Sequence, residues 1–220
     1  MNERDGKKGT TTLGLLCEDG VVLATEKRAT KGHMISHKDT KKLFKITDHI
    51  GLNIAGLVAD GQALTRFLSS EVELYELKRN KTISVEATTT LLSNIMMGRR
   101  LMPYYVGLVL GGVDPDGTGK VYSIDAMGGA ISEEYVAEGS GSQFVYGVLE
   151  DHYRKDMDID EGIELAVLSL LVSSSRDSAS GDGINLAKIT LENGFERLDD
   201  EEIDKIIAKV REEKDHLPPL

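Results

Sequence analysis

The chain has 220 residues, 40% of them hydrophobic, and a formal net charge of -11 at pH 7. This length suits one sizeable hydrophobic core and is short for two. The acidic balance argues against nucleic acid as a partner, because affinity for a phosphate backbone depends largely on Lys and Arg.

Strand and helix patterns alternate along the first half of the chain. Apolar and β-branched runs predict strands at residues 11–17, 21–25, 43–46 and 51–55, and Glu18-Asp19-Gly20 is a hairpin signal between the first two. Two helices are predicted to follow, the second with Ser84 as its N-cap. The apolar stripe of the first comprises Leu64, Phe67, Leu68 and Tyr75. The stripe of the second comprises Leu91, Leu92, Ile95 and Met96.

The second half predicts further strands and helices in the same order. The strands are expected at residues 105–113, 121–124, 184–191 and 195–198, and the helices at about 142–153, 159–174 and after Asp199. Helix 159–174 is apolar almost all round, which indicates burial between layers. Asp199, with Glu202 three residues later, is typical of a capping box, and Ile203, Ile206, Ile207 and Val210 should face inward. This order predicts an α+β domain with two antiparallel sheets and helices on their outer faces.

Several features indicate a cytoplasmic protein. The single cysteine, Cys17, cannot form an internal disulfide and lies in an apolar strand pattern, so we expect a buried, unreactive thiol in a reducing compartment. Residues 1–9 are polar and lack the apolar stretch of a secretory signal. The longest apolar runs, residues 104–110 and 165–172, are far shorter than the roughly 20 residues that span a bilayer, so no membrane partner is expected.

The run Lys8-Gly9-Thr10-Thr11-Thr12-Leu13-Gly14 places a threonine where one cleavage would make it N-terminal. A threonine hydroxyl is a poor nucleophile without a base, and an N-terminal threonine carries its own base, an α-amine with a pKa of about 7.7–8.0. Residues 1–9 would then be a propeptide removed by autocleavage at the Gly9–Thr10 bond, and residues 10–220 a single catalytic domain. Three consecutive threonines also suit the start of a strand, so the run alone leaves both interpretations open.

Motifs further along the chain favour the first interpretation. They are Ala24-Thr25-Glu26-Lys27-Arg28, Thr40-Lys41-Lys42-Leu43-Phe44, Ile54-Ala55-Gly56-Leu57-Val58, Gly139-Ser140-Gly141-Ser142 and Arg176-Asp177-Ser178-Ala179-Ser180-Gly181. Together with the threonine run they resemble the β-subunit of the 20S proteasome in its archaeal form, from Thr10 to about Arg211.

This resemblance implies a fold, an activity and partners. The fold would be the four-layer αββα sandwich of the N-terminal-nucleophile hydrolases. The activity would be that of a threonine endopeptidase, which degrades unfolded polypeptides through an acyl-enzyme. The family assembles β-subunits into seven-membered rings, two of which stack between rings of α-subunits, and a regulatory ATPase acts through the α-ring.

The resemblance also implies the roles of the residues around the nucleophile Thr10. Lys42 would be a buried ammonium that lowers the pKa of the Thr10 hydroxyl and α-amine. Glu26 would supply its counter-charge, although many family members carry the shorter aspartate there. Gly56 would direct its backbone N–H into the oxyanion hole, because no Cβ obstructs the substrate.

Three more residues would surround the terminal threonine by the same resemblance. Ser140 and Ser180 would hydrogen-bond its α-amine and hydroxyl, and Asp177 would orient the group. The alternative is that the first motif caps a helix, for instance through Ser142, and that the second only ends one. Family members often have adjacent glycines after the second serine, whereas this chain has Gly181-Asp182-Gly183.

Substrate contacts are expected on the other side of Thr10. The resemblance places Arg28 and Thr30 near the cleft, where Thr30 would bind the substrate backbone as an added strand. It assigns the lining of the first specificity pocket to Ala29, Thr40, Ile54 and Val58. Since none of these is charged, cleavage after large apolar or aromatic residues is expected.

Neither a metal nor a cofactor is expected. The five histidines are scattered, and only His33 and His37 share an i,i+4 spacing, in a polar stretch where exposure is the better interpretation. Asp114-Pro115-Asp116-Gly117 lacks the remaining ligands of a calcium loop and predicts a hairpin turn.

Two other functions remain as alternatives. A structural ring subunit without activity would lack the processable threonine or the partnering lysine, and this chain has both. An N-terminal-nucleophile amidase acting on a small molecule is disfavoured by Lys42 and by the motif at residues 176–181, and hydrolysis of peptides rather than small amides would separate the two.

Overall fold

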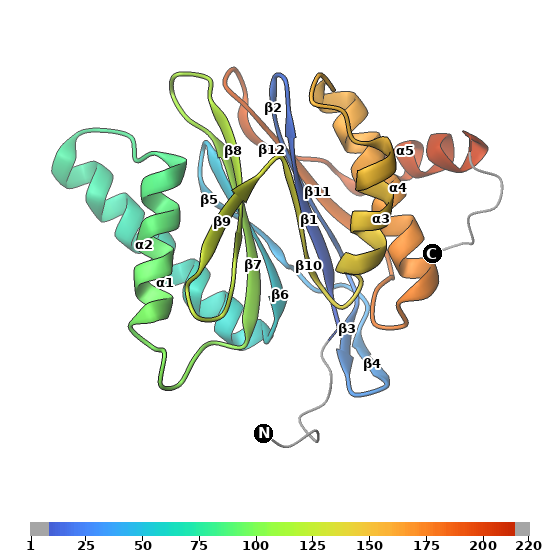
Figure 1. The fold of residues 1–220 in the computed structure, drawn as a ribbon, viewed down its shortest axis with the longest axis horizontal. Helices are drawn as coiled ribbons and strands as arrows, with labels where there is room; N and C mark the ends of the chain where they lie inside the picture. Colours follow the sequence, from blue (N-terminus) through green and yellow to red (C-terminus); the bar gives the residue numbers. More distant parts are fainter. Residues whose placement is uncertain (1–8, 214–220) are drawn as a thin grey trace.

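The computed structural model describes residues 9–213. The strands of its two large sheets are β1 (Thr11–Cys17), β2 (Gly20–Glu26), β5 (Leu43–Thr47), β6 (Ile50–Gly56), β7 (Val106–Val113), β8 (Gly119–Ile124), β9 (Ala130–Glu133), β10 (Tyr135–Gly139), β11 (Ile184–Thr190) and β12 (Gly194–Arg197). One sheet has the order β10-β1-β2-β11-β12 and the other β5-β6-β7-β8-β9, with antiparallel pairing throughout. The two sheets face each other at the centre of the molecule (Figure 1).

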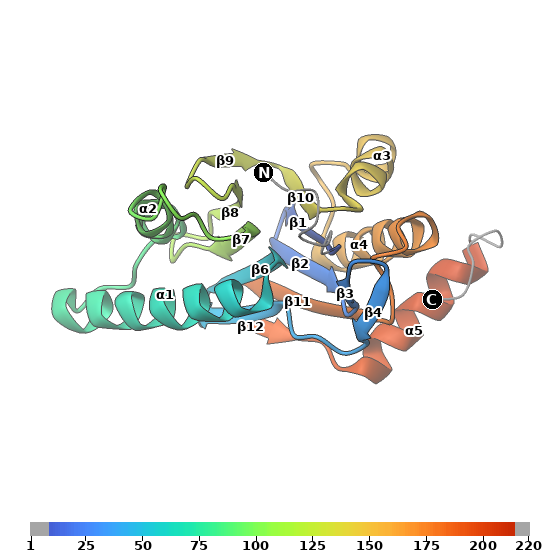
Figure 2. The ribbon, with the colours of Figure 1, turned by 90° about the horizontal axis from the view of Figure 1, so that it is seen from below.

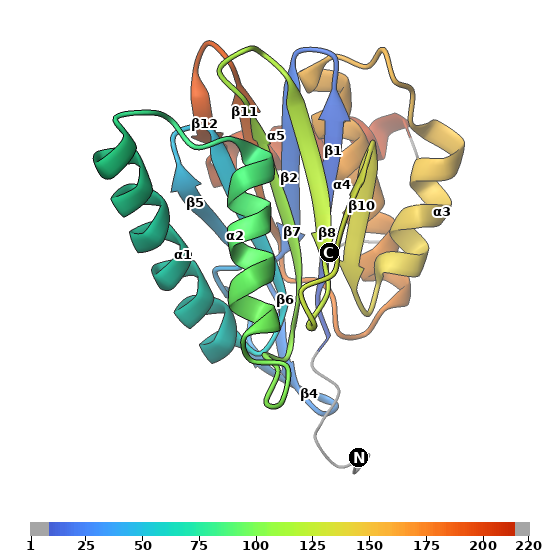
Figure 3. The ribbon, with the colours of Figure 1, turned by 60° about the vertical axis from the view of Figure 1, so that its left-hand side comes forward.

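Helices cover the outer face of each sheet. The β5–β9 sheet carries α1 (Val58–Arg79) and α2 (Val85–Met97), which lie side by side (Figure 3). The other sheet carries α3 (Ser142–His152) and α4 (Ile159–Arg176), with α5 (Asp200–Glu213) packed beside α4 (Figure 1). This arrangement confirms the α+β prediction and the four-layer αββα sandwich.

A small hairpin extends from one end of the sandwich. It consists of β3 (Ala29–Lys31) and β4 (Met34–His37), and seen from below it lies next to the end of β2 (Figure 2). The sequence predicts neither of these strands, nor β9 or β10. Strands β4 and β9 are exposed along their whole length and show no apolar alternation, and β10 buries two adjacent residues rather than alternate ones. None of the helices within residues 9–213 is long and apolar enough to cross a membrane.

Three apolar layers hold the sandwich together. The layer between the sheets consists of Val21, Leu23, Leu43, Val109, Val113, Val121, Val136, Ala187 and Ile189. The other two lie beneath the helix pairs. Helix α4 is buried along most of its length, as its all-round apolar pattern predicted. Cys17 is buried and free, and burial raises the pKa of its thiol to about 12, so its thiolate is disfavoured.

The predicted stripe of α1 is partly wrong. Leu64 and Leu68 pack inward as expected, but Phe67 is 50% and Tyr75 36% exposed. Val72 is the third buried apolar side chain of α1, because a helix that covers a sheet from one side buries a narrow row at i,i+4 spacing.

The predicted caps at Ser84 and Asp199 and the predicted turn at residues 114–117 are confirmed. Ser84 accepts a hydrogen bond from the Ala87 amide at 3.1 Å. Asp199 and Glu202 bond each other's backbone N–H at 2.8 and 2.9 Å. The 114–117 stretch forms a turn closed by a 2.8 Å hydrogen bond between the Gly117 N–H and the Asp114 carbonyl.

The strand register brings several of the predicted site residues together at one end of the β10-β1-β2-β11-β12 sheet. Thr11 lies opposite Gly139, Thr12 opposite Thr25, and Ile184 opposite Glu26. The start of β1 therefore meets the ends of β2 and β10 and the start of β11.

We predict that Leu23→Ala destabilises the fold by about 2–5 kcal/mol, as measured by urea unfolding of the purified chain. Leu23 is fully buried and fills space that Gly51 and Gly111 leave open on the facing sheet, since a Cβ at those positions would lie 2.6 and 3.0 Å from its methyl groups. Leu77→Ala on α1, where the side chain is 74% exposed, serves as the control and should stay within about 0.5 kcal/mol. Equal losses in the two variants would contradict this account of the core.

Candidate active site

Thr10 lies at the start of β1 and is 4% exposed. Its Oγ1 donates a hydrogen bond to the Gly9 carbonyl at 2.7 Å, and its amide donates to Ser140 Oγ at 3.3 Å. A Cβ on Gly9 would overlap Ala179, so only glycine fits before Thr10. The threonine hydroxyl is therefore held beside the carbonyl of the peptide bond that the sequence analysis expects to be cleaved.

Lys42 and Glu26 form a buried ion pair next to Thr10. Their side chains are 5% and 0% exposed, and Lys42 Nζ also donates to the Arg28 carbonyl. Glu26 Oε2 accepts from the amides of Arg28 at 2.6 Å and Gly181 at 3.2 Å, and Oε1 accepts from the Thr11 amide at 3.3 Å. The glutamate reaches the lysine despite its extra methylene relative to aspartate.

Burial shifts both members of this pair. It lowers the pKa of Lys42, an effect that the Glu26 charge opposes, and it raises the pKa of Glu26, which Lys42 and the backbone N–H groups oppose. Each charge is therefore stable only in the presence of the other, and removal of one residue leaves the other as an unpaired charge buried away from solvent.

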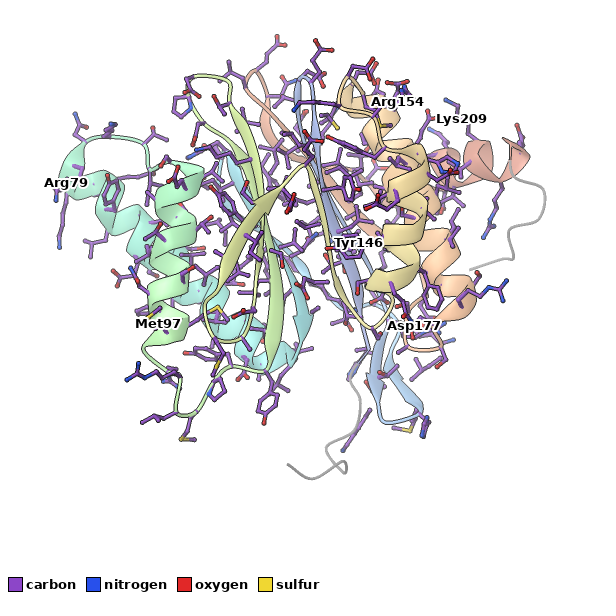
Figure 4. The ribbon with its side chains drawn as sticks, viewed as in Figure 1. Arg79, Met97, Tyr146, Arg154, Asp177 and Lys209 are labelled. Carbon is purple, nitrogen blue, oxygen red and sulfur yellow. The ribbon has the colours of Figure 1, made fainter. Side chains whose placement is uncertain are left out.

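Ser140, Asp177 and Ser180 form a hydrogen-bonded cluster that contacts the Thr10 amide through Ser140. Ser140 Oγ and Ser180 Oγ both donate to Asp177 Oδ2, at 2.5 and 2.7 Å. Asp177 directly follows α4, above the β3–β4 hairpin (Figure 4). The N-cap of α3 is Gly141 without a side-chain cap, so the interpretation of Ser142 as a helix cap is wrong.

A pocket of about 310 Å³ opens beside Thr10 and Lys42. Its lining includes the predicted Ala29, Ile54 and Val58, as well as Thr30, whose Oγ1 accepts from the Gly9 amide at 3.1 Å. Thr40 is not part of this lining, and its amide bonds the Lys27 carbonyl at 2.9 Å.

Several other residues line the pocket that the sequence did not predict there, namely Lys31, Ser36, His37, Lys41, Phe44, Leu57 and Gln62. Two of them had a signal in the sequence. Phe44 follows Lys42 by two residues at the start of β5, the spacing that places side chains on one face of an extended chain, and Gln62 lies one helical turn after Val58. Lys41 was expected at the surface; it is exposed, yet its ammonium also lies 5.2 Å from the centre of the Phe44 ring at the pocket.

Gly56 ends β6 and lines the same pocket. Its φ of +116° is unfavourable for other residues, and a Cβ there would overlap the Tyr105 carbonyl. A backbone N–H at this position can approach a substrate closely, which suits stabilisation of an oxyanion.

Arg28 is not among the residues that line the pocket. Its Nε bonds Asp182 at 2.6 Å, and its guanidinium donates to the Ser178 carbonyl at 2.9 Å. The departure Gly181-Asp182-Gly183 therefore supplies the partner of Arg28, and Asp182 adopts a positive φ of 61° in this loop.

The histidines show no metal site within residues 9–213, where no group of three or more His, Cys, Asp and Glu side chains could hold a metal ion. His33 and His37 are exposed, as expected. His216 lies outside the described residues.

Comparisons with known proteins agree with this geometry. The family model described as "Proteasome subunit" matches residues 6–189. The chain is 52% identical over 205 residues to "Proteasome subunit beta" of Ferroglobus placidus, covering 93% of this chain and 97% of that protein. It is 46% identical over 210 residues to the protein of the same name in Methanothermobacter thermautotrophicus, covering 96% and 100% of the two chains.

We predict that Glu26→Ala destabilises the chain by about 3–5 kcal/mol in urea unfolding, because Lys42 loses its counter-charge in a buried site. The matched control is Asp48→Ala, which removes the 2.5 Å ion pair between Asp48 and Lys45. The side chain of Asp48 is 92% exposed and that of Lys45 is 49% exposed. That change should stay within about 0.5 kcal/mol. If both substitutions had the same small effect, Lys42 would not depend on Glu26.

Proposed function

The chain belongs to the proteasome subunit family as a β-type, threonine-type endopeptidase subunit, and from this premise we propose that Thr10 is its N-terminal nucleophile. Residues 1–9 are a propeptide in this proposal, and residues 10–220 form the catalytic domain. The observation that carries it is the 2.7 Å contact between Thr10 Oγ1 and the Gly9 carbonyl oxygen.

The first reaction is cleavage of the chain itself. Thr10 Oγ1 loses its proton as it attacks the Gly9 carbonyl carbon, the C–N bond breaks, and the leaving nitrogen takes up that proton while the acyl group stays on Oγ1 as an ester. Water then hydrolyses the ester, which releases the propeptide and leaves Thr10 with a free α-amine. The Thr30 hydroxyl, which accepts from the Gly9 amide, holds the peptide backbone in place for this step.

The same residues then act on substrates. The α-amine takes the proton from Oγ1 as the oxygen attacks a peptide carbonyl, and the Gly56 N–H stabilises the oxyanion. Collapse forms the acyl-enzyme and expels the leaving amine, which receives the proton from the α-amine, and water completes the cycle. The charge of Lys42 favours the neutral amine and the deprotonated hydroxyl, and Glu26 keeps that charge in the site.

Peptide hydrolysis is favoured over hydrolysis of a small amide. Gly9 lies against Thr30 and lines the pocket, so the site already holds a stretch of peptide backbone. A substrate bound as an added strand would gain affinity through its main chain and be accepted with little sequence preference.

The proposed setting is the 20S core particle in the cytoplasm. Two seven-membered β-rings would stack between α-rings, and a regulatory ATPase would pass unfolded polypeptides inward. Confinement within such a chamber would restrict a broadly specific protease to chains delivered to it. No metal or cofactor takes part in the proposed reaction.

We predict that Thr10→Ala abolishes both processing and peptidase activity in particles assembled with α-subunits. Thr10→Ser, which keeps an oxygen nucleophile, should restore both at least in part. Intact mass measures whether residues 1–9 remain, and a fluorogenic peptide measures activity. Activity in fully assembled Thr10→Ala particles would refute the proposed nucleophile.

We also predict faster hydrolysis of fluorogenic peptides after Tyr or Leu than after Arg or Glu, because Ala29, Ile54 and Val58 give the pocket an apolar wall. Val58→Glu should raise cleavage after Arg relative to Tyr by about tenfold, which corresponds to about 1.4 kcal/mol in the transition state. Leu77→Glu, which adds the same charge on exposed α1 outside this pocket, is the control. Fastest cleavage after Arg or Glu in the unchanged particle would contradict the assignment of this pocket.

A further inference from the structure

A row of buried hydroxyl groups continues behind the cluster of Ser140, Asp177 and Ser180. Thr11 Oγ1 lies 2.6 Å from Ser180 Oγ and 2.8 Å from Ser173 Oγ. Thr11, Ser173 and Ser180 are all 0% exposed, so the three hydroxyls have no access to solvent. Neither Thr11 nor Ser173 has a part in the reaction described above.

The direction of each hydrogen bond in this row follows because each hydroxyl group has only one proton to donate. Asp177, as a carboxylate, can only accept, so Ser180 uses its single proton on Asp177 Oδ2. Ser180 must then accept from Thr11, and Thr11 in turn must accept from Ser173. The longer contact of Ser173 with the Gly141 carbonyl, at 3.4 Å, cannot hold the same proton. All the short contacts are satisfied only when donation runs from Ser173 through Thr11 and Ser180 to Asp177.

Because the Ser140 hydroxyl also has only one proton to donate, its orientation is fixed as well. Its proton goes to Asp177 Oδ2 at 2.5 Å rather than to the Thr10 carbonyl at 3.4 Å. Ser140 Oγ can therefore only accept from the Thr10 nitrogen, 3.3 Å away. Once that nitrogen is an amine, Ser140 holds one of its N–H bonds and leaves the nitrogen lone pair for the Thr10 hydroxyl. A Ser140 that donated instead would occupy the lone pair and block the base.

The absence of a side chain at Gly141 is an independent observation on this row, because the hydroxyl groups fill the volume next to Gly141. A Cβ on Gly141 would overlap both Thr11 Oγ1 and Ser173 Oγ and would lie 3.3 Å from Asp177 Oδ2. The loop that carries Ser140 thus packs directly on the hydroxyl row, without a side chain between them.

We propose that Thr11 and Ser173 are positioning residues, whose one-way hydrogen-bond chain through Ser180 and Asp177 keeps Ser140 as an acceptor for the Thr10 amine. The inference rests on the proposed function of Thr10. Loss of the Thr11 hydroxyl should lower kcat rather than raise KM, because the chain touches the nucleophile and not the pocket.

The test compares Thr11→Val with Thr12→Val in assembled, processed particles. Both changes replace a fully buried threonine by an isosteric residue on the same strand, but the Thr12 hydroxyl donates to the Ala24 carbonyl at 3.0 Å and not to a hydroxyl of the row. We expect Thr11→Val to lower kcat about tenfold with KM within about twofold, and Thr12→Val and Thr11→Ser to keep kcat within about threefold. Equal kcat values for the two valine variants would overturn the proposal.

A double-mutant cycle with Ser140→Ala separates positioning from a merely structural effect. If Thr11 acts through Ser140, adding Thr11→Val to Ser140→Ala should lower kcat by less than about twofold. A further tenfold loss would show that Thr11 acts independently and would overturn the proposal.

Other results also decide the question. A Thr11→Val particle that retains its propeptide beside a processed Thr12→Val particle supports the proposal, because the chain holds the Thr10 nitrogen before cleavage as well. If Thr11→Val does not assemble, Ser173→Ala is measured in its place. We expect Ser173→Ala to lower kcat about threefold, and to cause no further loss when it is added to Ser140→Ala. An unchanged kcat in Ser173→Ala would overturn the proposal. Activity in Thr10→Ala particles would instead refute the proposed nucleophile itself.

Discussion

The buried ion pair of Glu26 and Lys42 is the constraint on which the rest of the site depends. A charge without solvent needs a partner and a full set of hydrogen bonds, and these come from separate parts of the chain. Glu26 ends β2 and accepts from the amides of Thr11, Arg28 and Gly181, while Lys42 precedes β5 and donates to the Arg28 carbonyl. The pair therefore fixes the start of β1 relative to both sheets.

Thr10 also contacts a second polar group, the cluster of Ser140, Asp177 and Ser180, whose charge is negative. On one side, in the proposed reaction, the Lys42 cation would favour the deprotonated forms of the hydroxyl and amine. On the other, Asp177 takes the protons of Ser140 and Ser180, so that Ser140 faces the Thr10 nitrogen as an acceptor. In the proposed reaction, Lys42 and Glu26 would set the acidity of Thr10, and the serine–aspartate cluster would set its orientation. A side chain at Gly9 or Gly56 would overlap neighbouring atoms of the site.

The sequence predicted the layers well because their signals are local. Apolar periodicity, the cap at Ser84 and the reciprocal pair of Asp199 and Glu202 each depend on a few neighbouring residues. The exposed strands β4 and β9 lacked such a signal. Of the site, motifs located the charged and hydroxyl residues, but Thr11 looked like an ordinary strand residue. Its role depends on Ser173 and Ser180, and only the fold brings those positions together.

The central claim is that the α-amine of Thr10 is the base for the hydroxyl of the same residue. Acetylation of processed particles near neutral pH tests it most directly, because an α-amine with a pKa of about 7.7–8.0 reacts while ordinary lysines, at about 10.4, stay protonated. Peptide mapping measures the acetylated fraction of Thr10 and of Lys42, and peptidase activity is measured on the same sample. The account predicts that activity falls in proportion to acetylated Thr10 while Lys42, whose ammonium is buried in its ion pair with Glu26, is unmodified. Full activity in particles whose Thr10 amine is completely acetylated would contradict it.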